Sequence, residues 1–135
     1  MDKLTPERRS ANMRAIRSKS TKPEMLVRRL VHSLGYRYRL HRKDLPGKPD
    51  LVFAGKRKVL FVHGCFWHQH PDCREGRIPR TRQDYWVPKL AANVRRDRQH
   101  QEALTTAGWE VLTVWECETR DIATLTQRLQ DFLAS

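Results

Sequence analysis

The sequence is organised around a stretch in which an apolar segment leads into a cluster of possible metal ligands. It reads Leu60-Phe61-Val62-His63-Gly64-Cys65-Phe66-Trp67-His68-Gln69-His70-Pro71-Asp72-Cys73. The apolar residues 59–62 predict a strand that is buried on both faces. In proteins with open α/β sheets, the residues that bind ligands lie where such strands end. Histidine and cysteine are the donors that tetrahedral zinc takes, so the stretch predicts a metal site at a strand end.

This cluster contains more donors than one zinc ion uses. Zinc takes four ligands, and the local spacing alone would close the site with Cys65, His68, His70 and Cys73. Cys117 is distant in sequence, but it follows a second predicted strand, residues 109–116, and therefore lies at the same kind of strand end as Cys65. An odd cysteine count mixed with histidines favours a metal over disulfides, and a reducing compartment.

The rest of the chain predicts a small mixed sheet with helices on both faces. A helix is expected from Thr21 to Gly35, with Thr21 as its N-cap and Glu24 completing a capping box. Strands are expected at 36–40 and 51–53, followed by a tight turn at 54–57 and a return strand at 58–62. A helix starting at Pro88 and ending at Gly108, the strand 109–116 and a final helix through Leu133 complete the order, which is typical of an α/β domain.

Asp50 lies where a rigid turn meets an apolar strand. Two prolines and a glycine precede it in residues 45–50, and a carboxylate there can simply cap the turn. A Pro-Asp pair before a hydrophobic strand also resembles the first half of the metal motif of restriction-type nucleases. That motif would next place an acid and a lysine on the return strand, where this chain has Val62 and His63.

The charge predicts a polyanionic partner. Lysine and arginine total 27 against 15 acids, a net charge of +12. Residues 1–48 carry +10 and residues 110–135 carry −3, so the basic surface is mostly N-terminal, although a basic face that only aids solubility is the alternative. Residues 1–20 indicate an arm that orders on nucleic acid, or a loosely docked N-terminal helix. We expect a cytosolic monomer without a membrane segment, because the N-terminus is polar and no apolar run is long enough.

Three motifs carry a resemblance to a known family. HGCFWH at 63–68, PGKPD at 46–50 and VWEC at 114–117 resemble the very short patch repair (Vsr) DNA mismatch endonucleases. The similarity spans nearly the whole chain, from Asn12 to Cys117. It implies a restriction-endonuclease-like mixed sheet flanked by helices, with a structural zinc site. It also implies a DNA-contacting arm at 1–20 and a single zinc-containing endonuclease domain at 21–135.

The resemblance divides the donors between two metals. It assigns structural zinc to Cys65, His70, Cys73 and Cys117. The family's loop is one residue shorter before the position of Cys73, so Asp72 competes with His70 for the zinc. It also implies catalytic magnesium on Asp50 and on the backbone carbonyl of Val62, a position at which many members have threonine.

The resemblance also implies the remaining roles in the site. His68 would be the general base, with Asp97 orienting it, whereas Asp97 as an intrahelical ion-pair partner is the simpler interpretation. His63 would contact the phosphate or leaving group, and Glu24 would hold metal directly or through water if it does not merely cap its helix. Residues that would wedge into the base stack are Phe66, Trp67 and Trp86 from the major groove and Met13 from the minor groove.

The function implied is nicking of one DNA strand 5′ to the thymine of a T:G mismatch left by deamination of 5-methylcytosine. This would start very short patch repair in the bacterial nucleoid, together with a mismatch-repair matchmaker protein and a repair polymerase. The alternative is a DNA-binding protein that is stabilised by zinc and has no catalytic activity, but this interpretation leaves Asp50, His63 and His68 unexplained. A nuclease acting on branched or undamaged DNA is a third interpretation.

Overall fold

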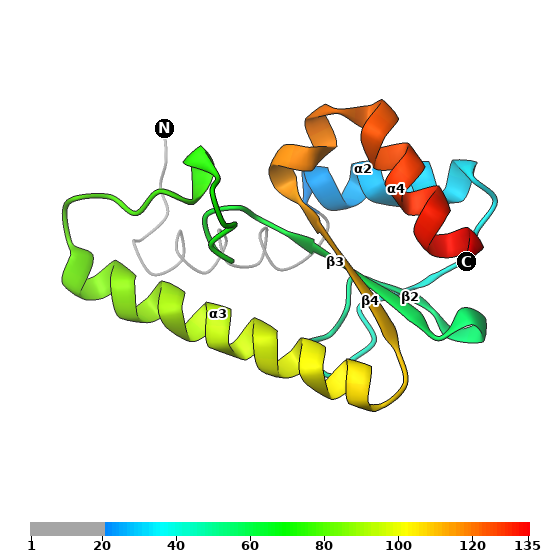
Figure 1. The fold of residues 1–135 in the computed structure, drawn as a ribbon, viewed down its shortest axis with the longest axis horizontal. Helices are drawn as coiled ribbons and strands as arrows, with labels where there is room; N and C mark the ends of the chain where they lie inside the picture. The colour runs from blue at the N-terminus through cyan, green and yellow to red at the C-terminus, as the bar shows by residue number, and fades with distance from the viewer. Residues whose placement is uncertain (1–20) are drawn as a thin grey trace, which may run out of the picture.

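The sheet in the described part of the chain, residues 21–135 of a computed structural model, has four strands in the order β1-β2-β3-β4 (Figure 1). Their bounds are Arg39–Leu40 for β1, Leu51–Phe53 for β2, Lys58–His63 for β3 and Glu110–Trp115 for β4. The pairs β1–β2 and β2–β3 are antiparallel, and β3–β4 is parallel. The mixed sheet is therefore confirmed. The predicted arm, with Met13, lies outside the described residues.

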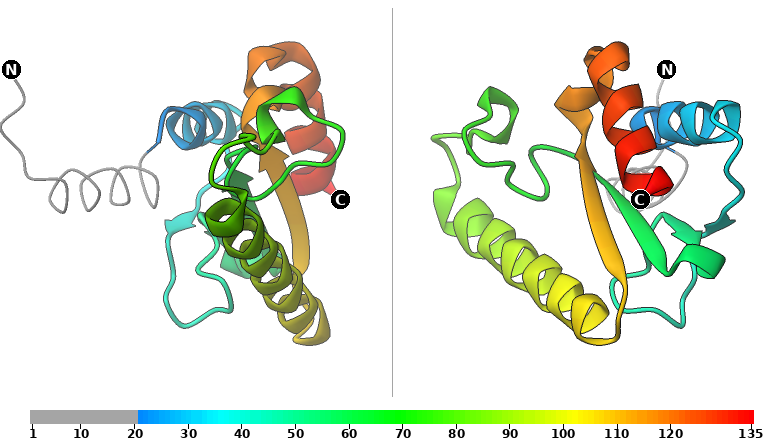
Figure 2. Two further views of the ribbon diagram at one scale, coloured as in Figure 1. Left: turned by 90° about the vertical axis from the view of Figure 1, so that its left-hand side faces the viewer. Right: turned by 45° about the vertical axis from the view of Figure 1, so that its right-hand side comes forward.

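Helices cover both faces of this sheet, as predicted. Helices α2 (Lys22–Ser33) and α4 (Ile122–Ala134) lie together on one side, and the long helix α3 (Gln83–Thr106) lies on the other (Figures 1 and 2). Alternation along the strands decides which side chain meets which helix. Leu51 and Leu60 join the core with α2 and α4, whereas Val52 and Val59 pack with Leu104 of α3.

Helix α2 begins as the capping residues predict, with one difference. The Thr21 hydroxyl accepts a hydrogen bond from the Glu24 backbone N–H at 3.3 Å. The Glu24 side chain does not complete the capping box but contacts Arg28 and His41. Gly35 follows the helix with φ +91°, the left-handed conformation that glycine adopts freely after a helix end. Glu24 is thus released from capping and is available to the site.

Two expected boundaries were wrong. Helix α3 begins at Gln83 rather than at Pro88, so Tyr85 and Trp86 lie inside its first turns. Pro88 removes only one backbone N–H from a helix of 24 residues. The strand expected at 36–40 is reduced to Arg39–Leu40. The turn expected at 54–57 is confirmed, because the 3-10 helix η1 (Ala54–Lys56) and Arg57, at φ +53°, join Phe53 of β2 to Lys58 of β3.

The strand register brings one end of every strand to the same edge of the sheet. In the parallel pair, His63 at the end of β3 lies opposite Trp115 at the end of β4. In the antiparallel pairs, the start of β2 lies beside the ends of β1 and β3. Asp50 therefore meets the segment that contains Val62 and His63. Within residues 21–135, no helix combines the length and apolar character that crossing a membrane requires.

Candidate active site and metal centre

Asp50 is fixed against the end of β3. The Val62 backbone N–H donates to its Oδ2 at 2.7 Å, which aims the carboxylate across the strand pair. Burial raises the pKa of the Asp50 carboxyl to about 8; the Val62 N–H lowers it, and the nearby Glu24 charge raises it. A carboxylate so poorly solvated favours a cation beside it. Oxygen donors of this kind fit a divalent cation such as magnesium.

Glu24 lies behind Asp50 and is almost completely buried, with 2% of its surface exposed. Its carboxylate pairs with Arg28 one turn along α2. The imidazole Nε2 of His41 lies 3.1 Å from Glu24 and 3.7 Å from Asp50 Oδ1. Glu24, His41 and Asp50 each offer a ligand atom, and these atoms lie within 4.8 Å of one another. The structure therefore brings two predicted site residues together with a histidine that the sequence analysis did not single out.

Two histidines and an aspartate form the other half of this site. His68 Nδ1 lies 2.6 Å from Asp97 Oδ2 of α3. His63 and His68 stack with ring centroids 3.8 Å apart and planes 7° from parallel. Burial, followed by the charge of His68, lowers the pKa of His63 to about 3. Because the alternation of β3 turns His63 to the same face as Phe61, both rings lie on the α3 side of the sheet.

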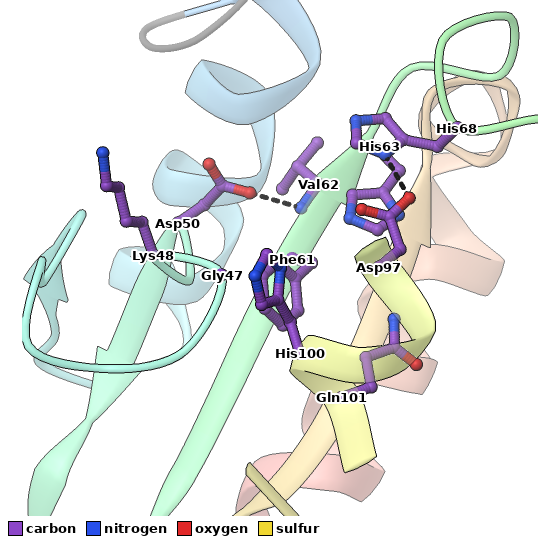
Figure 3. Close-up of a pocket in the computed structure, with 10 residues that line it drawn as sticks. All are labelled: Gly47, Lys48, Asp50, Phe61, Val62, His63, His68, Asp97, His100 and Gln101. Atoms are coloured by element: carbon purple, nitrogen blue, oxygen red, sulfur yellow. Dashed lines mark hydrogen bonds and ion pairs between the residues drawn. The ribbon is translucent and has the colours of Figure 1, made fainter. Parts of the chain in front are cut away.

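These groups surround a hollow of about 240 Å³. Figure 3 shows Asp50 and Asp97 approaching the end of β3 from opposite sides, with His63 and His68 above the hollow. His100 and Gln101 of α3 line its lower wall. The arrangement places a carboxylate that could hold a metal and an imidazole–carboxylate pair around one space.

A second group of donors forms the candidate metal centre. Sγ of Cys117 lies 3.4 Å from His70 Nδ1, and Sγ of Cys65 lies 3.7 Å from it. Ligands at about 2.3 Å (S) and 2.1 Å (N) from a tetrahedral zinc are about 3.6 Å apart. Cys65, His70, Cys73 and Cys117 together place their ligand atoms within 4.8 Å of one another. The four residues therefore fit one zinc ion.

The same geometry separates this donor set from the two alternatives. His68 lies with His63 and Asp97 and not with the cysteines. Asp72 is exposed, at φ +57°, and lies outside the four-residue cluster. Burial raises the pKa of the Cys65 thiol to about 12. A thiol in such a place ionises only with a cation beside it, as zinc would supply.

The predicted wedge residues gather beside the site. Phe66, Trp67 and Trp86 meet edge to face, with ring centroids 5.0 to 5.8 Å apart. Asn93 Nδ2 of α3 donates to the Trp67 backbone carbonyl at 3.1 Å. All three rings are only half buried, so neither member of the Phe66–Trp67 pair is absorbed by the core. The early start of α3 is what brings Trp86 to them.

A wider hollow of about 590 Å³ joins the aromatic cluster to the site. Val62 and His68 line both this hollow and the smaller one. Lys89 and Arg96 of α3 stand on its wall. Cationic side chains beside half-buried aromatic rings are typical of a surface that receives a nucleic acid.

Comparison with known proteins identifies the family. The sequence model for "DNA mismatch endonuclease Vsr" matches residues 1–75. The DNA mismatch endonuclease Vsr of Escherichia coli (strain K12) is 42% identical over 138 aligned positions, which cover 98% of this chain and 85% of that protein. The chain belongs to the Vsr family. Membership makes it a DNA endonuclease, a hydrolase of phosphodiester bonds.

Another relative and a solved structure are also similar to this chain. The Type II nicking enzyme V.XorIIP of Xanthomonas oryzae pv. oryzae (strain KACC10331 / KXO85) is 56% identical over 132 residues, covering 98% of this chain and 96% of that protein. The catalytic domain of the homing endonuclease I-Bth0305I superposes with a TM-score of 0.60 at 22% identity, over 85% of this chain and 96% of that domain. This likeness confirms the restriction-endonuclease-like fold.

Three residues of this candidate site were missed by the sequence analysis. His41 follows β1, and the antiparallel register places it opposite Asp50; only the strand pairing could have shown this. His100 lies one helical turn after Asp97 and lines the same hollow, a relation that helical periodicity would have indicated. Trp115 stacks on His70 with centroids 4.3 Å apart, and its place at the end of a predicted strand beside Cys117 was a usable signal.

Gly47→Ala should displace the turn that carries Asp50. Gly47 has φ +75°, and a Cβ there would lie 2.9 Å from the His100 Cβ. The conformation alone costs about 1–2 kcal/mol for alanine, and the overlap with α3 adds to it. We expect a lower melting temperature and slower DNA cleavage.

Two matched glycine variants separate these causes. Among the residues that the structure describes, a Cβ at Gly35 or at Gly55 would have no neighbour within 4 Å, and of the two only Gly35 has a positive φ. Gly47→Ala should be more destabilising than Gly35→Ala, and Gly55→Ala should be nearly neutral. Equal melting temperatures for the Gly35 and Gly47 variants would show that the close contact between residue 47 and His100 does not contribute to the loss of stability.

Proposed function

We propose that this protein nicks one strand of duplex DNA 5′ to the thymine of a T:G mismatch, the product of 5-methylcytosine deamination, and so starts very short patch repair. One observation carries the proposal. The Asp50–Val62 pair and the His68–Asp97 pair flank a single hollow at the end of β3, directly beside the aromatic cluster. A carboxylate for a metal, a base for water and rings that can enter a base stack are thus adjacent.

Magnesium is the ion proposed for the Asp50 side of the site. The Asp50 carboxylate and the Val62 carbonyl would hold it, with Glu24 contributing directly or through water. When bound, magnesium neutralises developing negative charge on the phosphate and the leaving oxygen. Asp50 is suited to this because its Oδ2 is oriented by the Val62 N–H, which leaves Oδ1 for a cation.

His68 is the general base in this proposal. A carboxylate only accepts hydrogen bonds, so Asp97 holds the proton of the neutral ring on Nδ1 and leaves the Nε2 lone pair free. Nε2 takes a proton from the attacking water as its oxygen bonds to phosphorus and the bond to the leaving oxygen breaks. Positioned bases of this kind contribute about 10²–10⁴-fold to rate. The structural role of Asp97 is thus orientation of His68.

His63 contributes a hydrogen bond rather than a charge. Its pKa is lowered to about 3 by burial and by His68, so the ring is neutral at ordinary pH. A neutral imidazole can donate a hydrogen bond to the phosphate or the leaving group without placing a second positive charge beside the metal. Its stacking on His68 also keeps the base ring in one orientation.

Zinc is the ion proposed for the cysteine cluster. Cys65, His70, Cys73 and Cys117 would hold it and tie the loop after β3 to the end of β4. Structural zinc contributes folding free energy directly. The loop it ties down carries Phe66, Trp67 and His68, so the zinc site also positions the catalytic base.

The aromatic cluster provides the proposed selection of a mismatch. Unstacking a base step costs a few kcal/mol, and least at a mismatch. Phe66, Trp67 and Trp86 would occupy the opened step from the major groove, and Met13 would enter from the minor groove. We further propose that the protein acts as a monomer in the bacterial nucleoid, before a repair polymerase and with a mismatch-repair matchmaker protein.

A duplex panel tests the proposal. Zinc-loaded protein with magnesium is incubated with otherwise identical duplexes that contain T:G, T:A, C:G or another mismatch at one position. We expect a nick only in the T-containing strand of the T:G duplex, on the 5′ side of the thymine. If no duplex is cleaved, the remaining interpretation is a DNA-binding protein that is stabilised by zinc and has no catalytic activity.

A sequence-directed nicking activity is the second candidate. Relatives such as V.XorIIP and V.NmeAIP are described as Type II nicking enzymes. The same panel, with the bases around the test position varied, separates the two. Nicking of a fully matched T:A duplex in one sequence context would favour this second candidate over mismatch repair.

Trp67→Ala should lose discrimination for the mismatch more than it loses DNA binding. One stacked base on an aromatic ring contributes about 1–3 kcal/mol, so we expect T:G selectivity to fall by about 5–150-fold in competition binding. Trp67→Phe keeps a ring in the cluster and should retain most of the selectivity. If the Trp67→Ala variant keeps the wild-type selectivity, the Trp67 ring does not take part in recognition of the mismatch.

A further inference from the structure

His41 is held at the metal side of the site by the strand pairing. It follows β1, its backbone N–H donates to the Asp50 carbonyl at 3.2 Å, and its φ is +48°. A left-handed conformation is uncommon for a residue other than glycine. The register of β1 on β2 therefore fixes a histidine side by side with Asp50.

The ligand atoms of this group have the spacing of a metal site. His41 Nε2 lies 3.1 Å from the Glu24 carboxylate and 3.7 Å from Asp50 Oδ1. Neighbouring ligands of an octahedral ion at about 2.1 Å lie about 3.0 Å apart. The three residues come from α2, the end of β1 and the start of β2, so three separate elements converge on one point.

The charges around this point also favour a cation. Glu24 and Asp50 have side chains only 3% and 15% exposed. Arg28 is the cation that pairs with Glu24 there, while Asp50 is oriented by a neutral backbone N–H. When both carboxylates are ionised, one arginine leaves an excess negative charge, which a divalent ion would neutralise.

Resting on the proposed function, we infer that His41 is a nitrogen ligand of the nicking-site metal, together with Glu24 and Asp50, and that it gives the site a preference for manganese over magnesium. Imidazole suits transition ions, whereas magnesium takes oxygen ligands and keeps its water. A site of two carboxylates and one imidazole therefore binds both ions but gains more from manganese.

Pulsed electron paramagnetic resonance of bound Mn²⁺ tests this directly. Zinc-loaded protein is used, so that the cysteine cluster is already filled. We expect ¹⁴N modulation in the wild-type spectrum, replaced by ¹⁵N lines when histidine is ¹⁵N-labelled. In His41→Asn the modulation should disappear and the Mn²⁺ dissociation constant should rise by about 10–100-fold or more, while Mg²⁺ affinity changes little. Asparagine is chosen because it tolerates the left-handed conformation.

Controls keep the outcomes separate. His32→Asn, at the exposed end of α2, should leave the spectrum unchanged, and Asp50→Asn should abolish Mn²⁺ binding at this site. A wild-type spectrum without nitrogen coupling, or one that survives in His41→Asn, overturns the inference even if the protein nicks T:G DNA. Nitrogen coupling from His41 in a protein that nicks no duplex upholds the metal ligand and overturns the proposed function instead.

Discussion

Asp50→Asn is expected to abolish nicking while the protein stays folded and zinc-loaded. Asparagine keeps an oxygen that can accept from the Val62 N–H but removes the charge that would hold magnesium. Metal stabilisation of the transition state contributes several kcal/mol, and each 1.4 kcal/mol or so is tenfold. We therefore expect the single-turnover nicking rate to fall by about 10³-fold or more.

The burial of Asp50 means that this substitution should change metal binding without destabilising the fold. Burial raises the pKa of its carboxyl to about 8, so the charged form is costly in the fold without a cation. Replacing it with a neutral isostere should not lower the melting temperature. Zinc content and T:G binding should also be retained, because Asp50 lies in neither the cysteine cluster nor the aromatic cluster.

Asp44→Asn is the matched control. Asp44 is exposed, and within residues 21–135 its ion pair is with Arg42 of the same loop, at 2.5 Å. It should nick at the wild-type rate. Wild-type nicking by Asp50→Asn, measured on the T:G duplex with magnesium, would show that the metal lies elsewhere.

Cys117→Ser is expected to lose zinc and much of the stability of the fold. Sγ of Cys117 is 3.4 Å from His70 Nδ1, and its backbone N–H donates to Cys65 Sγ at 3.4 Å. The residue therefore closes the cluster across 52 positions of sequence. Structural zinc contributes folding free energy directly, so we expect a loss of about 3 kcal/mol or more and a melting temperature lower by about 10 °C or more.

Metal analysis and thermal unfolding of purified protein measure this. Asp72→Asn provides the control, because Asp72 is exposed and lies outside the four-residue cluster. It should keep one zinc per chain and the wild-type melting temperature. If Asp72→Asn loses zinc while His70→Ala keeps it, the fourth ligand has been misassigned. A Cys117→Ser protein with full zinc content and unchanged stability would show that Cys117, at the end of β4, is not a zinc ligand.

Much of the site was present in the sequence because the chemistry is local. The apolar run 59–62 ending at His63 predicted a buried strand that ends in functional groups, and β3 has that form. The Pro-Asp turn predicted a carboxylate at the start of a strand, and Asp50 lies there. Hydrophobic periodicity gave the helices on both faces of the sheet. Each of these depends on neighbours within a few residues, whose alternation and turn chemistry a sequence displays directly.

Local rules failed where tertiary contacts outweighed them. Pro88 predicted a helix start, but α3 begins earlier, where Trp86 packs edge to face on Phe66 and Trp67. Glu24 carried two interpretations, and its side chain does not complete the capping box. Its backbone N–H meets the Thr21 cap, and its carboxylate turns toward Asp50 and His41.

Only the tertiary structure decided which donors meet. Local spacing alone would have closed the zinc site with His68 in place of Cys117, whereas the parallel pairing of β3 with β4 brings Cys117 beside Cys65. His68 is free to meet Asp97 because α3 crosses the same face of the sheet. His41 reaches Asp50 only through the antiparallel pairing of β1 with β2. The sequence determines which chemical groups are present and how each local segment folds, whereas distances between segments depend on strand register, and register is a property of the packed sheet.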